Sequence, residues 1–325
     1  MIKPIARYIF DASELVEQEP AQLFSKNKKV VYAIACPPGA VHKGKVNYSR
    51  WKYMELPDSI SIKGLSNRVT LRAGFYDYLP NEGISKALEW HVNFADPDLF
   101  LAYGTDLFAQ DEMQVAEHPV LASLKQKLNV LQSDASTVDG NDPTPILISG
   151  AERRCSVKTD QNSLENRPYG LYGNAFGRAS EDVIRKATMV IDPPTITNLI
   201  CIAAPDGGDG KYTKDEILYI LHTTYTGFRA ALIESDSSPV IIHSGYWGCG
   251  AFGGNRILVT WLQALAAQLA GVEQLILHTG DPDFGELKKA WAVIEKDLGN
   301  ETMPINTLIQ KILAMGFEWG VSDGN

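Results

Sequence analysis

The chain has 325 residues, of which 45% are hydrophobic and 21% charged, and its net charge is −9. This composition is typical of one large α/β domain or two modest globular domains. The negative charge argues against the broad basic surface that nonspecific nucleic-acid binding requires. We see no signal-peptide core, and the longest apolar stretch, Trp261–Leu277, is too polar to span a membrane. Because the four cysteines include no CxxC pair, we expect reduced thiols and a cytoplasmic protein.

The first 87 residues are predicted to form an N-terminal extension or accessory region. Two apolar, β-branched runs, Val30–Ala35 and Val69–Leu71, predict strands there. Between them lies a basic stretch with several prolines and glycines, Pro37–Lys45, which is typical of a loop.

From Leu88 to residue 325, predicted strands and helices alternate, which favours a mixed, mainly parallel sheet with helices on both faces. The strands are expected at Trp90–Ala95, Ile146–Ser149, Leu199–Ala203, Val240–His243 and Leu275–His278. The helices are expected at Ala109–Ala116, Lys214–Ile233, Arg256–Ala270, Phe284–Leu298 and Ile305–Met315.

Adjacent carboxylates, Asp111 and Glu112, follow Gln110 at the start of a predicted helix. Acids in a first helical turn are ordinary complements to the helix dipole. Their position in the chain also indicates a ligand-binding role, because they follow the C-terminal end of the predicted strand Trp90–Ala95. That end of a parallel strand is where α/β proteins bind ligands.

The segment His243–Asn255 carries five glycines between a predicted strand and a predicted helix. Such a turn exposes backbone N–H groups beside a helix N-terminus, which favours phosphate or pyrophosphate binding. A tight loop without a ligand is the alternative. Gly248–Gly253 also fits the dinucleotide fingerprint GxGxxG, but it lies late in the chain, and the expected ribose-binding acid falls on Glu273, before a strand. An NAD-dependent dehydrogenase is therefore a distant runner-up.

In a parallel sheet, the acidic helix start and the glycine-rich loop open on the same edge. A carboxylate pair opposite a phosphate cradle suits the cleavage of a glycosidic bond in a nucleotide sugar. One carboxylate can transfer a proton while the other stabilises positive charge on the sugar. The two motifs together therefore favour a glycosidase.

Two motifs resemble those of the poly(ADP-ribose) glycohydrolases, a branch of the macrodomain fold. Tyr246–Gly254 is similar to the signature loop of that family, and Val92–Asp96 resembles the macrodomain strand that ends at a ribose-binding residue. The family pattern continues without a gap to Glu112 and places the catalytic Gln-Glu-Glu on Gln110-Asp111-Glu112. Weaker similarities lie at Ile148–Glu152, Val190–Asp192 and Tyr225–Phe228.

The resemblance implies a macrodomain-like hydrolase that cleaves an O-glycosidic bond of mono- or poly-ADP-ribose conjugates and needs no cofactor or metal. Its substrate would be ADP-ribose or an ADP-ribosylated macromolecule. Glu112 would be the general acid and base, Asp111 would orient ribose hydroxyls and Gln110 would support the helix start. The implied ligand-binding residues are Asp96, Gly245, Tyr246, Gly248, Cys249, Gly250, Ala251, Phe252 and Gly253.

The chain departs from the family pattern at several positions. The three consecutive glycines of the family fall on Phe100-Leu101-Ala102, the adenine-stacking aromatic falls on Thr279, and a pocket tyrosine falls on Arg154. If Phe100–Ala102 closes the approach to the acids, the protein would be a non-catalytic reader of ADP-ribose or a related nucleotide.

Three histidines, His91, His243 and His278, lie in or near predicted strand ends and could converge. No i,i+4 pair or Cys/His spacing among them is typical of zinc. We therefore expect these histidines to be structural or to line a pocket.

Overall fold

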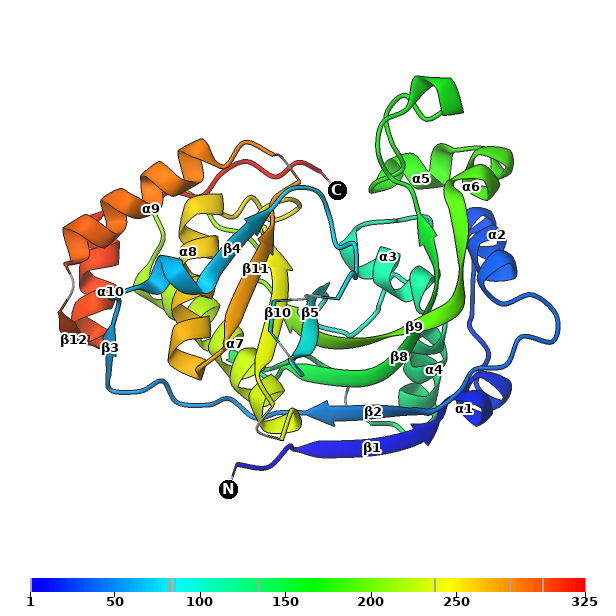
Figure 1. Ribbon diagram of the computed structural model, residues 1–325, viewed down its shortest axis with the longest axis horizontal. Coiled ribbons are helices and arrows are strands. Elements are labelled where there is room, and N and C mark those ends of the chain that lie inside the picture. The colour runs from blue at the N-terminus through cyan, green and yellow to red at the C-terminus, as the bar shows by residue number, and fades with distance from the viewer. Residues whose placement is uncertain are drawn as a thin grey trace.

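The computed structural model describes residues 2–80, 83, 84, 86–133, 135–236, 238–280, 282–299 and 301–324. A central sheet runs through the molecule and carries helices on both sides (Figure 1). Within the described residues it has eight strands, in the order β1 (Ala6–Asp11), β2 (Lys45–Arg50), β8 (Ile146–Val157), β9 (Thr188–Ala203), β5 (Leu88–Ala95), β10 (Val240–Gly245), β11 (Gln274–His278) and β4 (Val69–Arg72).

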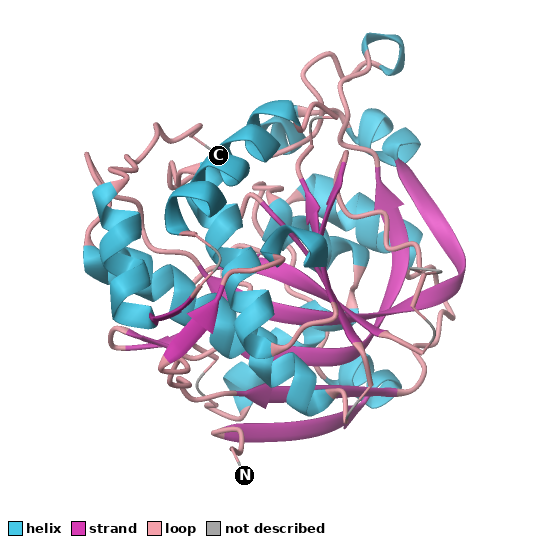
Figure 2. Cartoon of the chain, turned by 60° about the vertical axis from the view of Figure 1, so that its left-hand side comes forward, coloured by secondary structure: helices cyan, strands magenta, loops and turns pink. Residues whose placement is uncertain are grey.

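The sheet is mixed. From β9 through β5, β10 and β11 to β4 every neighbouring pair is parallel. The three pairs that join β1, β2, β8 and β9 are antiparallel. The predicted mixed, mainly parallel sheet with helices on both faces is therefore confirmed, and Figure 2 shows its strands crossing between the helices.

The helices form two groups, one on each side of the sheet (Figure 1). One group contains α7 (Lys214–Glu234), α8 (Arg256–Ala270), α9 (Gly285–Leu298) and α10 (Ile305–Ala314). The other contains α1 (Ala12–Gln18), α2 (Lys26–Ala35), α3 (Gln110–Glu117), α4 (Val120–Val130), α5 (Asn174–Arg178) and α6 (Glu181–Ala187). The remaining short elements are β3 (Ser59–Ser61), which pairs with β12 (Thr302–Pro304), β6 (Val138–Asp139), which pairs with β7 (Asp142–Pro143), and the 3-10 turns η1 (Leu65–Arg68) and η2 (Ser163–Glu165).

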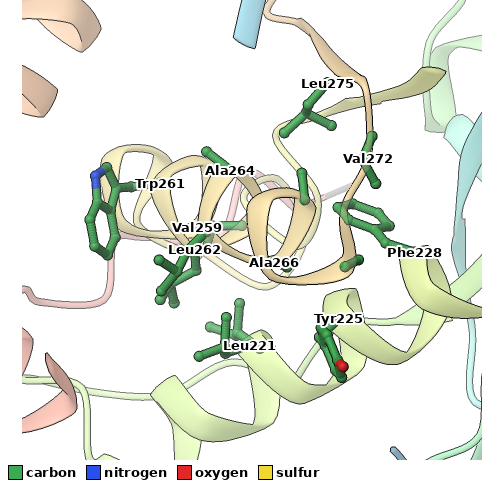
Figure 3. Packing of buried hydrophobic residues seen from close by; sticks show 14 of the residues in the cluster. Leu221, Tyr225, Phe228, Val259, Trp261, Leu262, Ala264, Ala266, Val272 and Leu275 are labelled. Atoms are coloured by element: carbon green, nitrogen blue, oxygen red, sulfur yellow. The ribbon is translucent and has the colours of Figure 1, made fainter. Parts of the chain in front are cut away.

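The core lies on both faces of the sheet because alternate residues of a strand point to opposite sides. Along β9, Ile200 and Ile202 pack with α7 and α8, whereas Leu199 and Cys201 pack with α1 and α4. The first of these clusters is the larger, and α8 lies directly over α7 in it (Figure 3).

The N-terminal region contributes to the same sheet. β1, β2 and β4 all precede Leu88, so the expected division at that residue does not coincide with an edge of the sheet. The predicted strand Val30–Ala35 is wrong, because these residues belong to helix α2, which Ser25 caps by accepting a hydrogen bond from the Lys28 N–H. Val30, Val31 and Ala35 are buried against α6 and the C-terminal half of α3, and this packing overrides the β preference of valine.

The other predicted elements are confirmed with small shifts at their ends. Val69–Leu71 lies in β4, and β8 and β9 are longer than expected. In the described part of the chain, no helix combines the length and the hydropathy that a membrane span requires.

Leu262 provides a test of the packing between α7 and α8. Its side chain is completely buried and faces Leu221 (Figure 3). Leu262→Ala should lower the free energy of unfolding by about 2–5 kcal/mol, because it removes apolar contacts and leaves a cavity. Leu164→Ala, the same change at a side chain that is 97% exposed, should change it by less than about 0.5 kcal/mol. Equal losses in chemical denaturation would contradict this core.

Candidate active site

The cleft of the molecule begins where two parallel strands separate. β5 pairs with β10 only as far as His91 and His243. Beyond this point β5 continues beside β9 to Ala95, and β10 continues beside β11 to Gly245. Strands that part at their C-terminal ends leave a crevice, which is the usual ligand site of open α/β sheets.

A cleft of about 620 Å³ opens at this edge. Both sequence motifs line it. Of the predicted site residues, those at the cleft wall are Asp96, Gln110, Asp111, Glu112, Gly245, Tyr246, Gly248, Cys249, Gly250, Ala251 and Phe252. Gly253 is not among the lining residues, and a Cβ there would stand 2.7 Å from the Gly320 carbonyl oxygen.

Gln110 attaches the start of α3 to β5. Its side-chain Oε1 accepts from the Phe94 N–H at 2.7 Å, and its Nε2 donates to the Val92 carbonyl at 3.1 Å. The hydroxyl of Tyr76 donates to the Val92 carbonyl at 3.0 Å and lies 3.3 Å from the His243 carbonyl. Two side chains thus occupy backbone groups that strand pairing would otherwise satisfy.

The two carboxyl groups follow directly in the first turn of α3 and are almost fully buried. Asp111 is 6% exposed and Glu112 is 4% exposed. Asp111 Oδ1 accepts a hydrogen bond of 2.9 Å from Asn93 Nδ2, which also donates to Gln114 Oε1. Glu112 Oε2 accepts from the Ala109 N–H at 3.0 Å and so caps its own helix. Each carboxyl is held in place while still lining the cleft.

Burial raises the pKa of both carboxyl groups, because it removes the water that would stabilise the charged forms. The neighbouring Glu112 adds to the increase in the pKa of Asp111. Lys28 of α2 opposes the increase in both pKa values. A carboxylic acid with a raised pKa retains its proton closer to neutral pH, as a general acid must.

Lys28 is itself completely buried. Its Nζ donates to the carbonyl of Tyr103 at 2.8 Å and lies 3.3 Å from that of Ala102. Burial lowers its pKa to about 8 despite the nearby acids Glu112, Asp111 and Asp106. The N-terminal region therefore supplies the cation behind the acid pair.

Hydrogen bonds to β9 and from α8 hold the glycine-rich loop in place. The indole of Trp247 is buried and donates to the Ile202 carbonyl at 3.0 Å, while Gln263 of α8 donates to the Gly245 carbonyl at 3.0 Å. Gly248 has φ +71°, in the left-handed region that favours glycine, and a Cβ there would stand 2.6 Å from the Ala204 side chain.

The loop presents free backbone donors. Among the hydrogen bonds of the described residues, none uses the N–H groups of Gly248, Gly250, Ala251 or Phe252. The loop ends at Asn255, whose side chain caps α8 by accepting from the N–H groups of Ile257 and Leu258. Unused N–H groups next to a helix N-terminus are suited to an anion.

The thiol within this loop is not activated. Burial raises the pKa of Cys249 to about 12, so it stays protonated at neutral pH. Arg256 lies over the ring of Tyr246 at 4.7 Å and places a cation at the cleft wall.

Of the positions where the chain departs from the family pattern, some line the cleft and others do not. Phe100 is buried in the core cluster with α1 and α4, and none of Phe100–Ala102 is among the described residues that line the cleft. Arg154, where the family pattern has a pocket tyrosine, is not among the lining residues; it donates to Glu152 at 2.7 Å and to the carbonyls of Ala35 and Val41. Thr279 does line the cleft.

The histidines form one connected group under the cleft. His91 stacks on His243 with ring centroids 4.3 Å apart, and His243 Nδ1 lies 3.0 Å from His278 Nε2. His278 lines the cleft, and burial lowers its pKa to about 4. In the part of the chain that the structure describes, no group of three or more His, Cys, Asp or Glu side chains could hold a metal ion.

Several cleft residues have no local sequence signal. The rings of Phe75 and Tyr172 are parallel within 4° at 6.0 Å. Arg153 lies over the ring of Tyr78 at 4.2 Å and pairs with Glu117 at 2.8 Å. Phe75 belongs to the loop after β4, and Tyr172 follows η2, so only the folded chain brings them to the cleft.

Comparisons with known proteins identify a family for part of the chain. Residues 141–284 match the family model described as poly(ADP-ribose) glycohydrolase, macro domain fold. This segment contains the glycine-rich loop but not the acid pair. A search of curated proteins found no match.

Two of the similar solved structures are bacterial poly(ADP-ribose) glycohydrolases. The protein from Thermomonospora curvata shares 12% identity over 82% of this chain and 97% of its own, with a TM-score of 0.47. The protein from Deinococcus radiodurans in complex with ADP-ribose shares 12% identity over 90% of this chain and 95% of its own, with a TM-score of 0.40.

The buried acid pair should make stability depend on pH. The pKa of Asp111 is higher in the folded chain than in the unfolded chain. The contribution of Asp111 to the free energy of unfolding is therefore fully present below about pH 4 and is lost as pH rises through the folded-state pKa. Asp111→Asn should therefore reduce the fall in the free energy of unfolding between about pH 4 and neutral pH. Chemical denaturation at several pH values measures this, with the exposed Asp209→Asn as control. Parallel curves for wild type and Asp111→Asn would contradict the electrostatics described.

Proposed function

We propose that the chain hydrolyses an O-glycosidic bond of an ADP-ribose conjugate. It is a divergent member of the poly(ADP-ribose) glycohydrolase family, whose model matches residues 141–284, and the members of this family are glycosidases. The observation that supports this proposal most strongly is a single cleft lined by two buried carboxyl groups and by a loop with unused N–H groups. The first can cleave a glycosidic bond, and the second can hold a diphosphate.

Glu112 is the proposed general acid. Its raised pKa favours a protonated carboxyl that donates its proton to the leaving oxygen as the bond to the ribose C1″ carbon breaks. The resulting carboxylate then accepts a proton from the water that attacks C1″. One water is consumed, and ADP-ribose is released with a free C1″ hydroxyl.

Asp111 and Gln110 have proposed positioning roles. The Asn93 amide orients the Asp111 carboxyl, which can accept from ribose hydroxyls. Gln110 joins α3 to β5 and so fixes the direction from which both acids enter the cleft. Asp96, at the end of β5, would accept from a further hydroxyl.

The glycine-rich loop is the proposed diphosphate site. The N–H groups of Gly248, Gly250, Ala251 and Phe252 would donate to phosphate oxygens, and the Phe252 ring would lie against the ribose. The substrate would be ADP-ribose attached to a macromolecule or to a further ADP-ribose unit.

A non-catalytic reader of ADP-ribose is the rival function. It was suggested by the change of the family glycines to Phe100-Leu101-Ala102. The burial of Phe100 away from the cleft favours the enzyme, because this segment does not occupy the approach to Glu112.

Glu112→Gln separates the two functions. The amide keeps the shape and the capping oxygen but has no proton to transfer. Release of ADP-ribose from ADP-ribosylated protein, polymer or nucleic acid should fall by about 10²- to 10⁴-fold. ADP-ribose should bind within a few-fold of wild type by calorimetry. Asp111→Asn should reduce the rate less, because its role is orientation.

Two results would refute this assignment. If wild type releases no ADP-ribose from any of these conjugates but binds ADP-ribose, the protein is a reader. If wild type is active and Glu112→Gln keeps the full rate, the acid is another residue.

Gly250→Val tests the diphosphate site. Gly250 does not adopt the left-handed conformation, and the nearest obstacle to its Cβ is a flexible carboxylate oxygen of Asp323 at 3.0 Å. The side chain should therefore be tolerated by the fold but obstruct the cleft, weakening ADP-ribose binding tenfold or more, at least ~1.4 kcal/mol. Gly285→Val on α9, whose Cβ also meets only a side-chain oxygen at 3.1 Å, is the matched control. Unchanged affinity with a normal melting curve would place the ligand elsewhere.

A further inference from the structure

The C-terminal segment Phe317–Gly324, called the strap below, crosses the glycine-rich loop. The Gly320 N–H donates to the Gly253 carbonyl at 2.7 Å, and the Asp323 N–H lies 3.3 Å from the Gly250 carbonyl. The Trp319 ring stacks on Tyr212 at 4.3 Å. In Figure 1 the strap returns from α10 to the middle of the molecule. The strap therefore borders the glycine-rich loop on one side.

The strap occupies carbonyl groups of the loop and leaves its N–H groups available. Its N–H groups at Gly320 and Asp323 point to the carbonyl oxygens of Gly253 and Gly250, and its Glu318 carbonyl accepts from the Asn255 side chain at 3.0 Å. At its far end, Gly324 accepts from the Asn174 side chain of α5 at 3.5 Å. The strap therefore spans the edge of the cleft from the α8 side to the α5 side without filling the anion site.

Asp323 brings a negative charge to this site. Its side chain lines the cleft, and its Oδ2 stands 3.0 Å from the position of a Cβ on Gly250. It also contributes to raising the pKa of Tyr172, which burial raises to about 12. Both observations place the carboxylate between the glycine-rich loop and the opposite wall of the cleft.

A carboxylate beside the glycine-rich loop reduces the electrostatic attraction of that loop for an anion. The unused N–H groups and the N-terminus of α8 attract negative charge, whereas Asp323 repels it. The repulsion grows with the charge of the ligand, and it is moderate because the Asp323 side chain is exposed to solvent.

We propose that Asp323 determines the charge selectivity of the cleft, admitting the diphosphate diester of an ADP-ribose unit and disfavouring ligands with more phosphate charge. This inference rests on the proposed diphosphate site in the glycine-rich loop. It does not depend on the cleavage step, because it concerns binding alone.

The test measures binding of ADP-ribose and of inorganic pyrophosphate, which carries more charge, to wild type, Asp323→Asn and Glu318→Gln. Asp323→Asn should tighten ADP-ribose binding by roughly three- to tenfold at low salt and pyrophosphate binding by more. High salt should reduce both gains, because screening weakens the repulsion. Glu318→Gln changes the charge of the same strap outside the cleft lining and should leave both affinities as in wild type.

Unchanged affinity in Asp323→Asn would overturn the proposal. So would weaker ADP-ribose binding, which would show that Asp323 accepts hydrogen bonds from the ligand. An equal gain for Glu318→Gln would show only a general charge effect. The proposed hydrolysis can be refuted independently of this inference. If Asp323→Asn binds pyrophosphate more tightly but wild type releases no ADP-ribose, the proposed enzyme activity is refuted and the proposed charge selectivity is supported.

Discussion

The pairing of Gln110 with β5 is the interaction on which the cleft depends. Once β5 and β10 separate, backbone groups of β5 lose their strand partners, and leaving them buried and unpaired would cost free energy. The Gln110 side chain accepts from the Phe94 N–H, and both Gln110 and Tyr76 donate to the Val92 carbonyl. Because Gln110 is also the first residue of α3, the same hydrogen bonds that repair the sheet fix where Asp111 and Glu112 stand. Opening of the cleft and placement of the acids are therefore one structural event.

The acid pair also connects regions that are distant in the sequence. Lys28 of α2 compensates part of the cost of burying two carboxyl groups and holds the backbone at Ala102 and Tyr103. Phe100 adopts φ +57° in this same loop, at a position where the family pattern has glycine, and its ring is buried in the core. A positive φ is uncommon for a bulky residue, so the contacts of the ring have to compensate for the strain. The loop thus keeps a conformation that glycine would favour while its side chain lies away from the cleft.

The sequence predicted the elements whose hydrophobic period is long and regular, such as Arg256–Ala270, and the two motifs that meet at the strand ends. It failed at Val30–Ala35, where β-branched residues lie in a helix because α3 and α6 pack against them. It also could not identify Phe75, Tyr172, Arg153 or Asp323 as cleft residues. Each reaches the cleft through tertiary structure, and none stands in a pattern that local spacing reveals. At the position of the family's pocket tyrosine, Arg154 does not line the cleft because adjacent residues of β8 point to opposite faces, and Arg153 is the one that faces the cleft.

The central claim is that the glycine-rich loop and the acid pair hold two ends of one ligand. A crystal structure of Glu112→Gln with ADP-ribose tests this most directly. The account predicts the diphosphate within hydrogen-bond distance of the N–H groups of Gly248, Gly250, Ala251 and Phe252, and the terminal ribose with its C1″ carbon next to residue 112. A diphosphate bound away from this loop, or a terminal ribose that points away from α3, would contradict it.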